Sequence, residues 1–552
     1  MKRMPLGVVV ATTFTLLITL SSHAWSYNLQ STPWPSHNSF TFMINTSSFT
    51  SRLNASSQNN SNLSLSQTQY ENWTLYALAQ WSAQSGTGWD HQYNGTTSLS
   101  PCAGSAHGDG HSVIGGGYGC EEPGCTTLAY TSPIISIFGN RTEADICILG
   151  LSTSSPSWTL AGTSLGTNEL DLVSVLVHEF GHALGIDDSN VYSVMHPGNR
   201  FLRNLYGDDI KAVRAAFPGN APVERDRRYR RYDHATNSWD NWQSIPGTSY
   251  WLEPSGAVGY SYIPNETLPH LDRLVVASNT KNGDAIHFTR ATTDPTVAPT
   301  WTTTVVNHPT WHRPAVASSG YVTQQWVSAW TVAQNDYNDC GYIDILHSSS
   351  DALVSGTYSR LFHCTNISPE LAYDHNSDRF ILAYIEGATP SGIQNRIVLR
   401  TSNNGGASWT SPQTLSISSL DTPSIACDAT SCTMSYMRAS GSDPWLVSRK
   451  INVNPTTGYV SLGNYTQEFT RLQKRPTTIS RGINEWMTTI HNPGTNQNRA
   501  NGHGRIRYHN SSSNPVYFDG FLWDYATAGD VFHNASLAGG YEYLDSYLLY
   551  IH

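Results

Sequence analysis

Two histidines stand four residues apart in the segment HEFGHALGIDD, residues 178–188, and a glutamate directly follows the first. On a helix, His178 and His182 lie one turn apart on the same face, so their imidazoles can bind one Zn²⁺. Glu179 then lies beside the metal without being a ligand, and it can accept a proton from an attacking water. The spacing therefore predicts a zinc-dependent hydrolytic site with Glu179 as general base.

A third zinc ligand is expected where the chain leaves this helix. Gly185 permits the left-handed turn that ends a helix, so the chain can fold back toward the metal. Asp188 follows three residues later, and a carboxylate is an accepted zinc ligand at about 2.0–2.2 Å. We expect the neighbouring Asp187 to point elsewhere, and His196 is the next candidate for the third ligand.

The helix that positions these residues is expected to begin near Asn168, which is a good N-cap residue. Glu169 and Asp171 then fall in the first turn, where the helix dipole favours acidic side chains. Apolar residues cover most of the circumference of the sequence DLVSVLVHEFGHALG, which begins at Asp171. The pattern predicts a helix buried inside its domain.

The surrounding elements form a mixed pattern of helix and strand. A helix is predicted over residues 67–84, because apolar residues recur there at helical spacing. The residues of its apolar face are Tyr70, Trp73, Ala77 and Trp81. Residues 39–44 and 144–149 are predicted as strands, and the Gly- and Cys-rich residues 100–127 as a loop. The first third of the chain is therefore expected to be an α+β domain.

These motifs, with SVMHP at residues 193–197 and YGDDIKAVRAAFPG at residues 206–219, resemble a metzincin metallopeptidase of the matrixin-like branch. His178, Glu179, His182, Gly185 and Met195 match the family pattern residue by residue. The resemblance covers roughly residues 27–218 and implies one catalytic zinc, with Met195 in a Met-turn that forms an apolar floor under the metal.

Asp188 departs from the family pattern, because most members have histidine there. Matrixins often carry an aspartate just before their third ligand, and Asp187 matches it, so the resemblance assigns the metal to Asp188. The alternative is a degenerate site that has lost its zinc. The intact Glu179 and Met195 favour the catalytic interpretation.

AHGDGH, residues 106–111, is a candidate for a second metal site, with His107, Asp109 and His111 as its ligands. The segment resembles the His-x-Asp loop that holds a structural zinc in matrixins. Tyr130 stands where the resemblance requires a further histidine, so one ligand is missing. An ordinary polar loop is therefore the favoured interpretation.

The N-terminus predicts export. Lys2 and Arg3 precede a short apolar run, and small residues at Ser22 and Ala24 follow at the positions that a signal peptidase recognises. We expect residues 1–24 to be a cleaved signal peptide and the protein to be secreted into the extracellular space. No other stretch is long and apolar enough to span a membrane.

Export makes the eight cysteines candidates for disulfide bonds rather than a zinc-thiolate cluster. Connectivity does not follow from sequence, but close pairs are favoured within each half of the chain. The favoured pairs are Cys120–Cys125, Cys340–Cys364 and Cys427–Cys432, which leave Cys102–Cys147. The net charge of −10 argues against a nucleic-acid partner.

The remainder of the 552-residue chain contains a repeat of roughly 50–60 residues, as in β-propellers. Each unit has an apolar strand followed by a strand that leads into a turn, and six copies of each part occur. The apolar strands begin near residues 274, 326, 380, 433, 486 and 547, and the second parts begin near residues 228, 285, 343, 397, 445 and 505.

The repeat begins with a second part and ends with a first part, so residues 547–551 are expected to share a blade with residues 228–239. The predicted architecture is an α+β peptidase domain, residues 25–218, a linker, residues 219–226, and an all-β six-bladed propeller, residues 227–552.

SNNGGASW, residues 402–409, resembles the Asp-box hairpin of sialidase-like propellers, with Asn404 in place of aspartate. The sequence shows no convincing set of sialidase arginines and acids, so the propeller is interpreted as a module that binds substrate, a carbohydrate or a protein ligand. The favoured function is a secreted zinc endopeptidase acting on protein or peptide substrates. The alternatives are a non-catalytic binding protein or adhesin and a propeller glycosidase.

Overall fold

The computed structural model describes residues 27–551 apart from several internal segments. The segments outside the description are 32, 35–40, 57–59, 83–91, 103–107, 119–126, 152–155, 161–164, 167, 191–192, 199–201, 218–226, 234–237, 240–242, 247–254, 262–270, 281–284, 292–298, 311, 320–324, 333–340, 349–352, 354, 366, 387–394, 429, 439–444, 472–474, 483–484, 493–502, 511–519, 522–534 and 539–545. The predicted signal peptide and linker lie outside the described residues.

The first domain is built on a five-stranded sheet with the order β2-β1-β3-β5-β4. Its strands are β1 (Thr41–Asn45), β2 (Gln92–Thr96), β3 (Ser112–Gly117), β4 (Ala129–Ile135) and β5 (Arg141–Leu149). Four strands run parallel, and β4 pairs antiparallel with β5 at one edge. A separate parallel pair joins β6 (Ser157–Thr159) to β7 (Glu169–Asp171).

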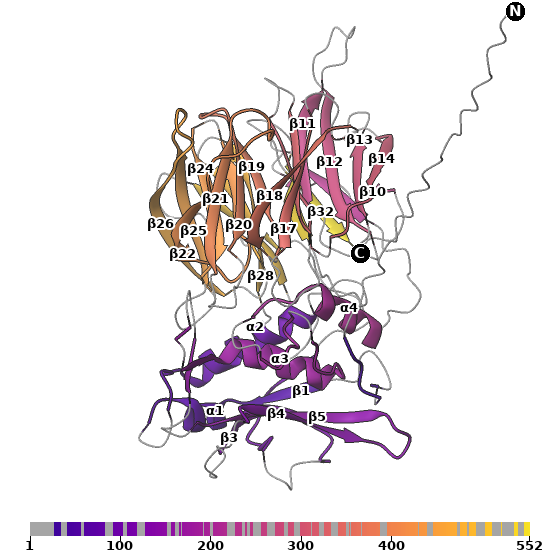
Figure 1. Cartoon of the computed structure of the whole chain (residues 1–552), viewed down its shortest axis with the longest axis vertical. Coiled ribbons are helices and arrows are strands. Elements are labelled where there is room, and N and C mark those ends of the chain that lie inside the picture. The colour runs from indigo at the N-terminus through magenta and orange to yellow at the C-terminus, as the bar shows by residue number, and fades with distance from the viewer. Residues whose placement is uncertain are drawn as a thin grey trace, which may run out of the picture.

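Helices α1 (Thr46–Leu53), α2 (Gln67–Ser82), α3 (Leu172–Leu184) and α4 (Gly207–Ala216) complete this domain. Figure 1 shows α2, α3 and α4 between the five-stranded sheet and the sheets of the second half. The helix predicted over residues 67–84 is confirmed over Gln67–Ser82, and its apolar face is buried. Trp81 of α2 contacts α3 directly: its indole nitrogen donates a hydrogen bond of 2.7 Å to the Val177 carbonyl.

Two sequence predictions for this domain are wrong. The predicted loop over residues 100–127 contains the buried strand β3. Its glycines are required by close packing, because a Cβ on Gly116 would lie 2.7 Å from the Ser48 carbonyl oxygen and one on Gly117 would lie 2.5 Å from Cys147 Sγ. The helix that carries His178 and His182 begins at Leu172 rather than near Asn168, because residues 169–171 pair as strand β7.

The second half forms six antiparallel sheets within the described residues. One joins β8 (Arg227–Asp233), β9 (Ser238–Trp239), β10 (Gln243–Ile245), β31 (Ala535–Ala538) and β32 (Ser546–Ile551). The next two are β11 (Ser255–Ser261), β12 (Leu271–Asn279), β13 (Ile286–Ala291), β14 (Trp301–Val306), and β15 (Ala315–Ser318), β16 (Trp326–Val332), β17 (Gly341–Ser348), β18 (Thr357–Thr365). The others are β19 (Glu370–Asp374), β20 (Arg379–Ile385), β21 (Arg396–Ser402), β22 (Gln413–Ser418); β23 (Ser424–Cys427), β24 (Cys432–Met437), β25 (Trp445–Val453), β26 (Val460–Arg471); and β27 (Thr477–Gly482), β28 (Glu485–Asn492), β29 (His503–Asn510), β30 (Gly520–Phe521).

The repeat found in the sequence corresponds to the two middle strands of these sheets. The predicted apolar strands are β12, β16, β20, β24, β28 and β32, and the predicted second parts are the strands that pair with them. The predicted joining of the two ends is confirmed, because Tyr547 pairs with Arg231 and Ile551 with Arg227 in the β32–β8 ladder.

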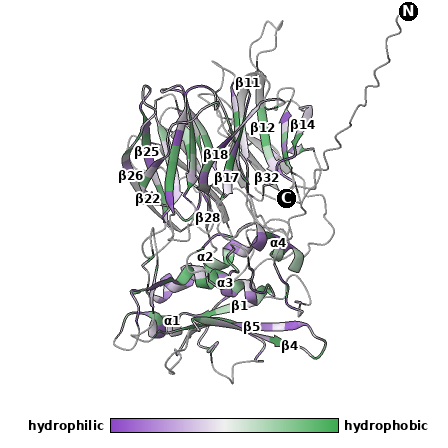
Figure 2. Ribbon diagram, in the orientation of Figure 1, coloured by the Kyte–Doolittle hydropathy of each residue, from purple (hydrophilic) through white to green (hydrophobic). Residues whose placement is uncertain are grey.

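Neighbouring sheets pack face to face through apolar side chains. Three buried clusters each draw residues from two consecutive sheets, and Figure 2 shows the hydrophobic stretches on these strands. The first strands also contact one another from sheet to sheet, in the order β11, β15, β19, β23, β27 and β31, and β31 returns to β11.

The core of the first domain extends into the second half of the chain. Leu420, Met437 and Leu446 belong to the same buried cluster as the residues around α2 and α3. Asn204 Nδ2 also donates a hydrogen bond of 3.0 Å to the Leu420 carbonyl. The two halves are therefore joined by a buried apolar contact as well as by the chain itself.

Two of the predicted disulfides are confirmed, Cys102–Cys147 and Cys427–Cys432. The predicted pair of Cys120 and Cys125 lies outside the described residues, and so does Cys340, the predicted partner of Cys364. No helix in the described part of the chain is long and apolar enough to cross a membrane.

Candidate metal centre

A capping residue defines each end of helix α3: Asp171 at its N-terminus and Gly185 at its C-terminus. Asp171 is its N-cap, with Oδ2 accepting a hydrogen bond of 3.0 Å from the Ser174 amide. The Asp171 carboxylate also forms a buried ion pair with Arg203, at 2.5 Å between Nη2 and Oδ1. Gly185 ends the helix with φ of 93°, a conformation that glycine adopts without steric cost. The chain therefore reverses where the sequence predicted.

His178, His182 and Asp188 converge beyond this reversal. Each histidine Nε2 lies 3.5 Å from the same Asp188 oxygen, Oδ1, and the ligand atoms of all three lie within 4.8 Å of one another. The two imidazole centroids are 4.7 Å apart. Two nitrogens and one carboxylate oxygen match the three protein ligands of a catalytic zinc site.

The hydrogen bonds of both imidazoles leave the nitrogen that faces Asp188 available to a metal. His178 Nδ1 lies 2.9 Å from the Val194 carbonyl, and His182 Nδ1 lies 2.9 Å from the Ile186 carbonyl. A carbonyl can only accept, so Nδ1 carries the proton and Nε2 keeps its lone pair. Burial, helped by the neighbouring His182, lowers the pKa of His178 to about 4, so this ring is neutral as a zinc ligand must be.

Glu179 is buried beside these ligands and outside their cluster. Its carboxylate Oε2 lies 2.7 Å from the hydroxyl of Thr131 on β4, which is also 3.0 Å from the Glu179 carbonyl oxygen. Burial raises the pKa of Glu179, and the Thr131 hydrogen bond acts in the opposite direction. The role of Thr131 could not be predicted from the sequence, because Thr131 lies 48 residues before Glu179 and no motif links the two.

Met195 packs against α3 at Gly181, the residue before His182, and its side chain is buried. A Cβ on Gly181 would lie 2.2 Å from the Met195 sulfur, so a larger residue at this point of the helix would displace the Met195 side chain. Asp209 of α4 holds the Met195 segment, because its carboxylate accepts hydrogen bonds of 2.9 and 3.2 Å from the amides of Val194 and Met195. The Val194 carbonyl in turn orients His178.

The two other candidates for the third ligand have different surroundings. Asp187 Oδ1 accepts a hydrogen bond of 3.0 Å from the Asp188 amide, which is a local contact. His196 Nδ1 accepts a bond of 3.0 Å from the Gly198 amide. Among the described residues, the cluster of possible ligands around His178 contains neither of them.

The candidate second metal site at residues 106–111 is only partly described, because His107 lies outside the described residues. Asp109 Oδ1 accepts a hydrogen bond of 2.8 Å from the His111 amide. Buried Glu143 fixes the loop, because its two carboxylate oxygens accept hydrogen bonds from the amides of Gly108 and Gly110. These hydrogen bonds stabilise the conformation of a polar loop.

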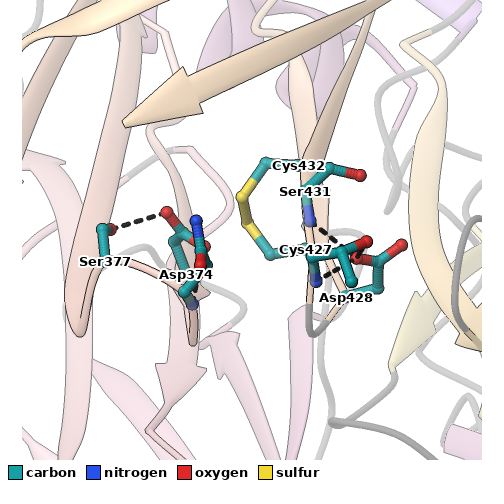
Figure 3. Close-up of a disulfide and its surroundings, with 8 residues drawn as sticks. Asp374, Ser377, Cys427, Asp428, Ser431 and Cys432 are labelled. Atoms are coloured by element: carbon teal, nitrogen blue, oxygen red, sulfur yellow. Dashed lines mark hydrogen bonds between the residues drawn. A yellow bond between two sulfur atoms is a disulfide. The ribbon is translucent and has the colours of Figure 1, made fainter. Parts of the chain in front are cut away.

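One further cluster of possible ligands, Asp374, Cys427 and Cys432, is not suited to a metal. The two cysteines are joined in a disulfide, so neither offers a thiolate, and the hydroxyl of Ser377 donates to Asp374 at 2.6 Å (Figure 3). The neighbouring Asp428 closes a turn by accepting from the amides of Thr430 and Ser431. The cluster therefore belongs to two hairpin turns.

The segment that resembles an Asp-box forms a closed turn between β21 and β22. Asn404 Oδ1 accepts a hydrogen bond of 2.9 Å from the Ser408 amide, and Trp409 Nε1 donates one of 3.0 Å to the Gly406 carbonyl. Gly405 and Gly406 have positive φ and lie against Gln325, just before β16 of the preceding sheet, and Val327, within β16. The motif therefore joins adjacent sheets.

A buried ionic cluster in the second half was missed by sequence reasoning. Glu370 Oε2 lies 3.0 Å from Arg313 Nη2 and 2.6 Å from Arg475 Nη2, and Ser424 donates to Oε1 at 3.0 Å. All four residues stand at or just before the first strand of their sheets. The available signal was the recurrence of Arg-Pro just before the first strand in two repeats, at Arg313 and Arg475, with Glu370 opening the first strand of a repeat between them.

Comparison with known families gives one match, to the matrixin family of metallopeptidases, over residues 54–217. This match supports a metzincin-like peptidase domain in the first part of the chain. Curated proteins give no match.

Several solved structures resemble the chain weakly. An α-L-arabinofuranosidase from Fusarium graminearum matches at 12% identity with a TM-score of 0.34, covering 54% of this chain and 97% of its own. An α-L-arabinanase from Penicillium chrysogenum matches at 12% identity with a TM-score of 0.32, covering 54% and 98%. The likeness is too low to support an argument, so the fold rests on the strand pairings.

Proposed function

We propose that this protein is a secreted zinc-dependent endopeptidase. The observation that carries the proposal is the convergence of two imidazole Nε2 atoms on one Asp188 oxygen at 3.5 Å, with both Nδ1 atoms bonded to main-chain carbonyls. Such an arrangement presents lone pairs toward one point and fixes both rings before a metal arrives. The matrixin match over residues 54–217 supports the same class.

Zinc bound by His178, His182 and Asp188 would lower the pKa of a water and polarise the scissile carbonyl. Glu179 is placed to accept the proton of the attacking water and to deliver it to the leaving amine. Burial of Glu179 keeps bulk water away from this carboxylate, and Thr131 holds one of its oxygens. The edge strand β4 beside Glu179 offers main-chain groups with which an extended peptide substrate can pair.

The second half is proposed to be a six-bladed β-propeller that begins after a linker at residues 219–226. Six sheets, the return of the first-strand contacts from β31 to β11, and the pairing of β32 with β8 support this architecture. Its role is proposed to be binding of substrate, a carbohydrate or a protein at a surface. The peptidase domain would span residues 25–218 after removal of a signal peptide at residues 1–24.

The class of function is tested by metal removal and replacement. The full chain is treated with a chelator, and cleavage of casein and of a quenched fluorescent peptide is measured before and after zinc is restored. We expect activity to disappear with the metal and to return with about one zinc per chain. A protein that binds zinc and cleaves neither substrate would instead favour a non-catalytic binding protein.

A further inference from the structure

The turn between β4 and β5 projects three apolar side chains into solvent. Ile137 is 95% exposed, Phe138 is 84% exposed, and Ile135 at the end of β4 is 48% exposed. Figure 1 shows this hairpin extending past the other strands of the sheet, and Figure 2 marks its end as hydrophobic. Exposed apolar residues gathered at one site mark a surface that contacts something else.

The main chain of this turn is closed on itself. The Ser136 amide donates to the Asn140 carbonyl at 2.7 Å, and the Gly139 amide donates to the Ser136 carbonyl at 2.9 Å. The Ser136 hydroxyl accepts from the amides of Phe138 and Asn140 at 3.3 and 3.2 Å. Most amides of the turn therefore need no water, which is the condition for entering a medium poor in hydrogen-bond partners.

Charge is absent from the turn and from the strand that leads to it. Residues 128–140 contain no Asp, Glu, Lys or Arg. The first charged residue that follows, Arg141, is buried and directed inward, where Nη1 donates to the carbonyls of His182 and Ala183. The turn therefore offers neither attraction nor repulsion to a charged partner.

The size of the exposed group favours a lipid surface over a protein. Three side chains of at most about 250 Å² each remain below the roughly 800 Å² that each partner buries in a standard protein interface. A few apolar side chains on a projecting turn are sufficient for weak, reversible contact with a bilayer interface.

We propose that the β4–β5 turn inserts Ile137 and Phe138 into the interface of a lipid bilayer with zwitterionic headgroups. The proposal goes beyond the proposed peptidase activity and does not depend on it. Ile137 stands six positions after Thr131, four of them along β4, so the contact would place Glu179 roughly 20 Å from the bilayer surface. Proteins close to a membrane would then be within its reach.

The test is flotation of the full chain with vesicles of phosphatidylcholine at lipid concentrations on the order of millimolar. The chain carries Glu179→Ala to prevent self-cleavage, and it is made in a host that does not glycosylate, because Asn140 begins an Asn-x-Thr sequon. Binding is compared with that of an Ile137→Ser/Phe138→Ser variant. Tyr459→Ser is the matched control, because Tyr459 is 62% exposed in a turn of the second half.

We expect the parent and the Tyr459 variant to float, and the double variant to bind at least about tenfold more weakly with an unchanged melting temperature. Equal binding of all three, or no binding of the parent, would overturn the proposal. Binding only to vesicles with anionic lipid would also overturn it, since the turn carries no charge. Loss of a dimer in the double variant, without vesicle binding by the parent, would identify a second copy of the chain as the occupant instead.

Discussion

At the scale of single residues, the candidate site depends on which carboxylate completes the donor set. Asp188 Oδ1 faces both imidazoles at 3.5 Å, whereas Asp187 accepts the Asp188 amide. We predict that Asp188→Ala weakens zinc binding by more than the about 10–100-fold that loss of an outer-shell partner costs. Asp187→Ala should keep its zinc, and Asp188→His should keep both zinc and measurable activity.

Metal content after dialysis against a fixed free zinc concentration decides between these carboxylates. Zinc lost from Asp187→Ala and kept by Asp188→Ala would show that the wrong aspartate was chosen. Zinc kept by both variants would show that neither aspartate is the third ligand, and His196 would then be tested.

Thr131 is predicted to position the general base. Replacing it with valine keeps the shape and removes a hydrogen bond of 2.7 Å to the Glu179 carboxylate. Hydrogen bonds to charged groups contribute about 1.5–3 kcal/mol, so kcat should fall roughly 10–100-fold. KM and zinc content should change little, and Thr131→Ser should restore most of kcat. A fall in zinc content, or no rescue by serine, would point to a structural role for this side chain.

At the scale of elements, helix α3 packs closely against the side chain of Met195. Alanine is normally the better helix residue, by about 1 kcal/mol over glycine. At position 181, however, a Cβ would lie 2.2 Å from the Met195 sulfur and 2.8 Å from Trp81. We therefore predict that Gly181→Ala lowers the free energy of unfolding by about 1–3 kcal/mol.

A double-mutant cycle identifies the cause of that loss. Gly181→Ala should cost clearly less in a Met195→Ala background, because the sulfur that it displaces is gone. Strictly additive free energies of unfolding would mean that Met195 does not press against this helix.

Elements that local chemistry specifies could be predicted from the sequence. The apolar spacing of α2, the left-handed Gly185 and the apolar middle strands of the second half each carry their own signal. The start of α3 could not be predicted, because Asn168 and Asp171 are both good N-caps and only the pairing of β7 with β6 decides between them. The glycines of β3 favour the prediction of a loop. They are needed in the strand because α1 and the Cys102–Cys147 disulfide pack against them, which the sequence does not reveal.

Site residues that act through contacts distant in the sequence could not be predicted either. His178 and His182 follow from their spacing, but the carbonyls that orient them and Asp209, which holds one of those carbonyls, depend on the fold. Thr131 reaches Glu179 only because β4 lies beside α3.

At the scale of the whole molecule, the two halves share a buried core. Leu420, Met437 and Leu446 pack into the core of the first domain, and burying one such side chain is worth about 1.5–3 kcal/mol. Residues 25–218 alone should therefore melt at a lower temperature than the same domain in the full chain. They should still hydrolyse small peptides, because the three proposed zinc ligands and Glu179 lie within them.

Differential scanning calorimetry and peptide cleavage by the truncated domain check this prediction. An unchanged melting temperature would show that the shared core contributes nothing. A truncated domain that folds, binds zinc and is inert would show that the second half supplies part of the active site.

The most direct test of the account is one comparison of zinc content and peptidase activity between the wild type and Glu179→Ala. Glu179 lies beside the ligands and outside their cluster, so its loss should leave about one zinc per chain and abolish cleavage of casein and peptides. Full activity in Glu179→Ala, or a wild type that holds zinc and cleaves nothing, would contradict the proposal that this site is a zinc endopeptidase.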